Sequence, residues 1–196
     1  MGIAAMGVAL DAEAYQRAAA VFGETIAALS DAEWELKISD EWTVISTVAW
    51  VVVGDSQITQ AIDNGEIVAV AEFDAAVLGG NPVATWRGTA IAAITSLKAV
   101  GSSERVVRHP GGRFAVADLL GQRVTENLIR AWDVGRAAGR PVDIPVDLAD
   151  ACLDFWADHA DAVLAGGVLP EQPIEPSDDA DTVTRLLALT GRSVRA

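Results

Sequence analysis

Apolar positions in this chain recur mostly with the spacing of amphipathic helices. The first such segment begins at Asp11, an acceptor suited to capping a helix, and continues to Ser30. Its apolar face comprises Tyr15, Ala18, Ala19, Phe22, Ile26 and Leu29. Another segment begins at Pro82, a residue favourable in the first turn of a helix, and ends near Gly101. On its inner side we expect Trp86, Ile91, Ile94 and Leu97.

The pattern DLLGQRVTENLIRAWDVGRAAGRP, at residues 118–141, predicts the longest amphipathic helix, which we expect to run from about residue 114 to 138. Glu126, Arg130 and Asp133 follow one another at i, i+4 and i+7, so they share one face. Apolar contacts around the same helix are expected from Leu119, Val124, Leu128, Ile129 and Trp132. Gly139 and Pro141 end it.

Residues 42–62 leave helix and strand both open, because VISTVAWVVV is rich in β-branched residues and would suit a buried strand on propensity alone. A further helix is expected at 147–164, followed by a short helix that docks through Leu186, Leu187 and Leu189. Between these segments we expect a helical turn and loop at 31–40, a turn at 63–65, a weakly helical or irregular segment at 66–78, and a loop or short extended piece at 102–113.

Length and composition indicate one globular domain of 196 residues, with a core at about 10–165 and a docking tail at about 166–196. The formal charge of −14 argues against nucleic acid, which needs clustered cations. No apolar run approaches the roughly 20 residues that span a bilayer, so we expect no membrane contact. Cys152 is the only cysteine, and the first ten residues lack the basic start of a signal peptide. We therefore expect a cytoplasmic protein.

The helix around Glu126 also resembles a family signature, carried by Glu126, Trp132, Asp133, Arg136, Ala137 and Gly139. These positions are similar to the metal-binding helix of the DinB-like, mycothiol-dependent maleylpyruvate isomerase superfamily. The resemblance extends to Trp42-Thr43-Val44, to His109-Pro110 and to the ending at 185–192. It implies an all-α, DinB-like four-helix bundle (up-down-down-up) with short accessory helices. It also favours a helix at 42–62, with Ser46, Trp50, Val53 and Gln57 on one face.

In that family a glutamate and two histidines hold a divalent metal, and the resemblance places Glu126 at the glutamate position. Arg130 and Trp50 stand where the two histidines belong. An arginine is a permanent cation without a lone pair to donate, and an indole does not ligate metal. We therefore expect no metal and no other cofactor. The i, i+4 spacing instead predicts an ion pair between Glu126 and Arg130.

The functional prediction from these residues is a metal-independent isomerase, lyase or cyclase of specialised metabolism, acting on a small molecule in an apolar pocket. Glu126 would be the acid and base, and Arg130 would clamp an anion. The expected substrate contacts are Trp50, Trp132, Trp42, Ser46, Gln57 and Asp133.

Three alternatives stay open from the sequence. The ion pair is purely structural in the first, and in the second the pocket binds or sequesters a small molecule without catalysis. The third is a metal- and thiol-dependent isomerase or transferase with a rearranged metal site at His109 or His159. The partner in every functional case is a small molecule, and exposed apolar helix faces would allow a homodimer.

Overall fold

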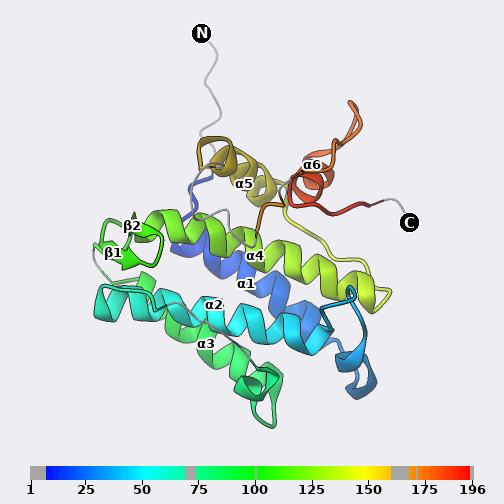
Figure 1. The fold of residues 1–196 in the computed structure, drawn as a ribbon, viewed down its shortest axis with the longest axis horizontal. Helices are drawn as coiled ribbons and strands as arrows, with labels where there is room; N and C mark the ends of the chain where they lie inside the picture. The colour runs from blue at the N-terminus through cyan, green and yellow to red at the C-terminus, as the bar shows by residue number, and fades with distance from the viewer. Residues whose placement is uncertain (1–7, 69–73, 100, 160–167, 171, 195–196) are drawn as a thin grey trace.

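The computed structural model describes residues 8–68, 74–99, 101–159, 168–170 and 172–194. It is predominantly helical and carries one two-stranded antiparallel sheet (Figure 1). The helical class predicted from the apolar periodicity is confirmed. None of the helices in the described ranges is both long enough and apolar enough to cross a bilayer.

Six α-helices form the described fold: α1 Ala12–Ala27, α2 Val44–Asn64, α3 Pro82–Leu97, α4 Val116–Ala137, α5 Val146–His159 and α6 Thr182–Leu189. Two short 3-10 helices lie at Asp31–Glu35 and Ala75–Leu78. The hairpin consists of β1 Val106–His109 and β2 Gly112–Ala115, and Val107 is paired with Phe114.

The four long helices pack against one another: α1 contacts α3 and α4, and α2 contacts the same two helices (Figure 1). α1 and α3 are antiparallel, because Gln16 near the start of α1 bonds Lys98 at the end of α3, whereas Phe22 further along meets Trp86. α2 and α4 are antiparallel too. Buried apolar side chains from all four long helices form the core.

Local signals explain where the helices begin. The Asp11 side chain accepts hydrogen bonds from the amides of Glu13 and Ala14 at 2.9 and 3.0 Å, which caps α1 as predicted. Gly23 lets α1 approach α3, since a Cβ there would lie 2.1 Å from the Trp86 ring. Pro82 opens α3 as predicted.

The ambiguous segment at 42–62 is helical. Thr43 caps α2, and Gly65, with φ of 74°, ends it in the left-handed conformation. The valines lose some helix propensity, but Val44, Val48 and Val51 are fully buried, and this packing outweighs the loss.

The structure corrects one predicted helix face, refines one segment and leaves two segments partly outside the described residues. Ile91 is 58 % exposed, because the inner face of α3 follows Trp86, Ala90, Ala93 and Leu97 instead. The segment predicted as a loop or short extended piece is a hairpin that reaches Ala115, so α4 starts at Val116. Residues 69–73 and 160–164, which belong to segments predicted as weakly helical and helical, lie outside the described residues.

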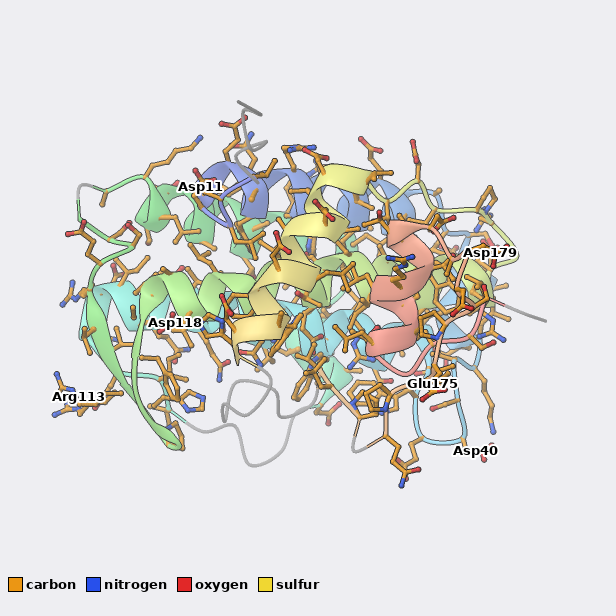
Figure 2. The ribbon with its side chains drawn as sticks, turned by 90° about the horizontal axis from the view of Figure 1, so that it is seen from above. Asp11, Asp40, Arg113, Asp118, Glu175 and Asp179 are labelled. Atoms are coloured by element: carbon orange, nitrogen blue, oxygen red, sulfur yellow. The ribbon has the colours of Figure 1, made fainter. Side chains whose placement is uncertain are left out.

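The two last helices cover one side of the bundle. α5 packs on α4, and α6 packs on α5, as Figures 1 and 2 both show. The Trp156 indole donates to the Thr125 hydroxyl at 2.9 Å, which ties α5 to the middle of α4. Leu186 and Leu187 of α6 are buried, as the docking prediction required, and Leu189 packs beside them partly buried.

Candidate functional site

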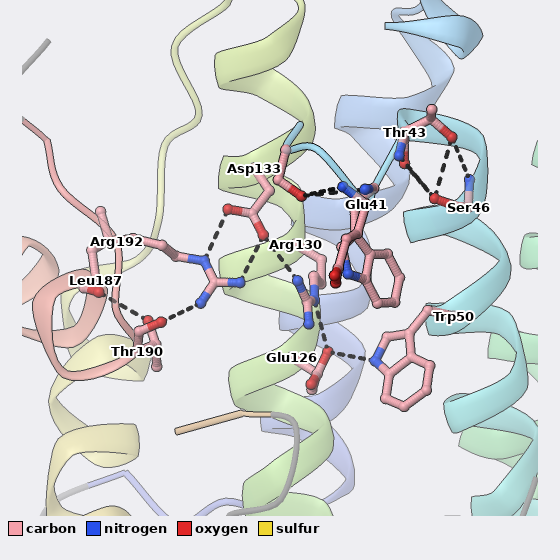
Figure 3. A network of polar contacts seen from close by, with 12 residues as sticks. Glu41, Thr43, Ser46, Trp50, Glu126, Arg130, Asp133, Leu187, Thr190 and Arg192 are labelled. Carbon is pink, nitrogen blue, oxygen red and sulfur yellow. Dashed lines mark hydrogen bonds and ion pairs between the residues drawn. The ribbon is translucent and has the colours of Figure 1, made fainter. Parts of the chain in front are cut away.

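Glu126 lies at the centre of the candidate site, in the middle of α4 and fully buried. Its Oε2 accepts a hydrogen bond from Trp50 Nε1 of α2 and another from Arg130 Nε, each at 3.1 Å (Figure 3). Trp50 and Arg130, which stand where the family pattern has histidines, therefore both bind this carboxylate. The predicted Glu126–Arg130 ion pair is present.

The ion pair continues through Asp133 to the end of the chain. Arg130 Nη1 donates to Asp133 Oδ2 at 3.3 Å. Arg192, just after α6, donates from Nε to Asp133 Oδ1 at 2.9 Å and from Nη2 to Oδ2 at 2.7 Å (Figure 3). This forked contact fixes the C-terminal segment to α4.

Two of the predicted tryptophans join the cluster. The rings of Trp42 and Trp50 meet edge to face, with centroids 5.9 Å apart, and the Arg130 guanidinium carbon lies 5.3 Å from the Trp42 centroid. Trp132 does not join these two rings. The guanidinium carbon of Arg136 lies 5.2 Å from its ring centroid, and Trp132 lines a surface groove. The indole wall next to Glu126 therefore comes from Trp42 and Trp50.

Ser46 and Gln57 occupy the two ends of the predicted face of α2. Ser46 accepts from the Thr43 amide at 2.9 Å and donates to the Thr43 carbonyl at 3.0 Å, so its hydroxyl serves the helix start. Gln57 donates to the Val68 carbonyl at 3.4 Å and lines a small cavity near Arg123. Trp50 lies between them along the helix and is the one that reaches Glu126.

The residues at this position do not fit the divalent metal that the resemblance implies. Glu126 Oε2 already accepts two N–H groups. Burial lowers the pKa of Arg130, but the carboxylates of Glu126 and Asp133 raise it by more, so the guanidinium remains a cation. In the described ranges no three His, Cys, Asp or Glu side chains come together in a way that could hold a metal.

The two histidines of the third alternative lie on different elements. His109 ends β1, and its Nδ1 accepts a hydrogen bond from the Gly111 amide at 3.0 Å. His159 ends α5, stacks on Phe155 and has its Nε2 3.7 Å from Asp118 Oδ1. Each histidine is thus held by its own local contacts.

A second buried polar group, missed in the sequence, lies beside Glu126. Asp55 of α2 is fully buried and accepts from Asn127 Nδ2 at 3.2 and 3.4 Å. Burial raises the pKa of Asp55 to about 6, against the opposing pull of the Arg123 guanidinium. Burial and the Asp55 charge also raise the pKa of Tyr15 well above its usual value. Arg123, Glu126 and Asn127 lie at i, i+3 and i+4 on one face of α4, and this run of polar residues was the sequence signal that could have revealed the group.

Several buried polar atoms here have no hydrogen-bond partner in the described part of the chain. They are Thr47 Oγ1, Arg123 Nη1, Glu126 Oε1 and Asn127 Oδ1. Each such atom costs roughly 1–3 kcal/mol of folding free energy. The interface of α2 and α4 therefore holds more hydrogen-bonding capacity than its own side chains use.

In comparisons with known proteins, no family model matches the chain, and no curated protein matches it either. The geometry of the α2–α4 interface therefore carries the functional proposal.

Proposed function

We propose that the protein is a DinB-like helical bundle without the family metal, and that it binds a small molecule at the interface of α2 and α4 without transforming it. The observation that carries the proposal is the group of buried polar atoms there without partners, which includes Arg123 Nη1 and Glu126 Oε1. In native proteins such atoms are rare, and a bound water, ion or ligand or a functional role explains them. The single cysteine, free and buried, supports a cytoplasmic location as part of the same proposal.

Two features support the DinB-like relationship. Trp50 and Arg130, at the two histidine positions of the family pattern, converge on one oxygen of Glu126 although they come from different helices. The antiparallel pairs α1–α3 and α2–α4 also agree with an up-down-down-up bundle (Figure 1).

Binding fits the geometry better than acid/base catalysis by Glu126 does. The Glu126 side chain is only 1 % exposed, and its Oε2 is engaged by two donors. Arg130 already contacts both Glu126 and Asp133. A general base must lie within hydrogen-bond reach of the proton that it removes, and an anion clamp needs unused donors. A substrate would have to break these contacts first.

A metal-independent isomerase, lyase or cyclase is the second candidate, and one observation favours it. Glu126 Oε1 is buried and has no hydrogen-bond partner among the described residues, in contrast to Oε2. An oxygen in that position could accept a proton from a ligand that enters the interface.

A ligand screen followed by one substitution tests both candidates. Small molecules are screened by thermal shift and by tryptophan fluorescence, since Trp42 and Trp50 lie at the site. In a binding protein, Glu126→Gln should change the affinity for a bound compound, and neither form of the protein should convert that compound. In an enzyme, the variant should lose the turnover that the wild type shows. Glu24→Gln, an exposed change of equal charge on α1, is the control. A screen without any hit contradicts both candidates and leaves the ion pair as a structural feature.

A further inference from the structure

A small cavity opens one turn of α4 away from Glu126, between α2, α4 and the hairpin. Its polar lining consists of Gln57, His109, Gln122 and Arg123, and Gly54 forms part of its wall. The cavity volume is about 20 Å³, which is room for roughly one water-sized group. Any ligand group that enters must therefore be very small.

The Arg123 guanidinium is the unusual member of this lining. Its side chain is 6 % exposed, and within the described ranges it makes no hydrogen bond; its one carboxylate contact is Glu126 Oε1, at 4.0 Å from Nη2. Arg130, by contrast, is hydrogen-bonded to a carboxylate at 3.1 Å. Arg123 Nη1 is fully enclosed and without a partner. A guanidinium in this state retains donors arranged for an anion.

Gly54 makes the position of this guanidinium feasible. A Cβ built on Gly54 would lie 1.6 Å from Arg123 Nη1. Because Gly54 is helical, the glycine is not needed for a turn here; it provides the space in which the guanidinium lies along the cavity wall. The glycine lowers the helix propensity of α2, and in its place the Arg123 guanidinium has room.

The charges around Arg123 leave room for an added negative group. Asp55 is a further buried acid that interacts with Arg123, and it faces Tyr15 from α1 and Arg123, Glu126 and Asn127 from α4. Burial raises the pKa of Asp55 to about 6, so the protonated form predominates below that pH. With Asp55 protonated, Arg123 has only the long contact to Glu126 as counter-charge.

We propose that the Arg123 cavity binds a small anion, either a free ion or the carboxylate head of the ligand, held by the guanidinium and by polar groups at the mouth. This inference rests on the proposed binding function and names the chemistry of its deepest group. Gln57 and Gln122 supply amide N–H groups at the mouth. His109 Nδ1 accepts from Gly111, so in the neutral ring Nε2 carries the proton and can donate. The small volume of the cavity, about 20 Å³, favours the smallest anions over sulfate and phosphate.

The test is a titration followed by the backbone amide of Gly54 and the Arg123 Nε–H signal in ¹⁵N NMR spectra. Sodium formate and sodium chloride are the probes, and sodium sulfate at equal ionic strength is the size control. Formate or chloride should shift both signals saturably, whereas sulfate should not. Tighter binding of formate identifies a carboxylate head, and tighter binding of chloride identifies a free ion. Equal, non-saturating shifts with all three salts would overturn the proposal.

Substitutions then assign the site. Arg123→Gln should weaken formate binding at least tenfold, whereas Arg113→Gln, the same change at the exposed edge of the hairpin, should leave it unaltered (Figure 2). Because Arg123→Gln changes a buried group, its fold is checked by circular dichroism, and His109→Phe at the mouth provides a second variant. His109→Phe should weaken binding roughly fivefold, the loss of one hydrogen bond. Unchanged affinity in folded Arg123→Gln would contradict the proposal.

The outcome separates this inference from the binding function itself. If neutral compounds from the ligand screen bind and change the tryptophan fluorescence while formate and chloride do not bind, the anion site is wrong and the binding function stands. If the anions bind at Arg123 and no compound from the ligand screen binds, the anion site stands and the proposed binding function is wrong.

Discussion

Trp50 and Arg130 donate to the same oxygen of Glu126, and the two distances are equal at 3.1 Å. One donor is a neutral indole and the other is a cation, so together they saturate Oε2 and neutralise the carboxylate. A buried carboxylate needs such compensation when no metal supplies it.

Placing histidine at positions 50 and 130 should create a metal site. With Trp50→His and Arg130→His, two imidazoles would face Glu126 Oε2, which is a ligand set suited to zinc. We expect the double variant to bind about one equivalent of Zn²⁺, measured by elemental analysis after dialysis, and to gain thermal stability with the metal. Adding Glu126→Gln should remove most of this affinity. A double variant that folds but takes up no zinc would contradict the proposed DinB-like relationship.

Removing one partner of the buried pair should be costly. Arg130→Met leaves Glu126 buried without its hydrogen-bonded cation and with only the long contact to Arg123. We expect a loss of roughly 3–5 kcal/mol in the free energy of unfolding, measured by urea denaturation. Combining it with Glu126→Gln should cost less than the sum of the two single changes by about 2 kcal/mol. Arg17→Met, which breaks the exposed pair with Asp147, should cost below about 1 kcal/mol. Strict additivity would show that the pair is not coupled.

Arg192 should hold the C-terminal segment in place. Arg192→Met removes both hydrogen bonds to Asp133, although Arg130 still contacts that carboxylate. We expect a loss of roughly 1–3 kcal/mol and faster proteolytic cleavage within residues 172–194, followed by mass spectrometry. Arg185→Met, an exposed arginine on α6, is the matched control and should leave the cleavage rate unchanged.

Asp55 should make the protein less stable as pH rises. Its folded pKa is raised to about 6, above the unfolded value of about 3.9, so the native state binds more protons between these values. This contribution is fully present below the unfolded pKa and is lost as pH rises through 6. Asp55→Asn should remove a difference of roughly 2 kcal/mol between pH 4 and 7.5 in urea unfolding.

The opposite sign is expected for Asp147. Its hydrogen bond from Arg17 lowers its pKa, so its contribution is present at neutral pH and is lost as pH falls through the folded pKa. With Asp147→Asn, the protein should therefore lose less stability as pH falls, whereas its loss of stability as pH rises should not change. A variant of Asp55 with the same pH profile as the wild type would contradict its raised pKa.

Helix positions were largely predictable from the sequence because their signals are local. Asp11 and Pro82 mark the starts of α1 and α3, and both assignments agree with the structure. α2 was harder, since its valines favour strands when considered alone, and the family resemblance was needed to choose the helix. The predicted inner face of α3 was wrong at Ile91, because α3 carries apolar or small residues on more than one of its faces.

The site was predictable only in part, because burial of polar groups depends on packing between distant segments. The Glu126–Arg130 pair follows from spacing on one helix. The approach of Trp50 was expected only from the resemblance. Gly54 gave no local signal that it makes space for Arg123. The contact of Asp133 with Arg192 joins residues 59 positions apart in the sequence.

The forked contact between Arg192 and Asp133 connects α6 to the polar cluster around Glu126. Asp133 is shared with Arg130, and Arg130 with Glu126, so docking of α6 and occupation of the α2–α4 interface draw on the same carboxylates. Two equilibria that share groups in this way are linked, and the linkage is reciprocal. A ligand that favours the docked arrangement would itself be held more tightly when α6 is docked.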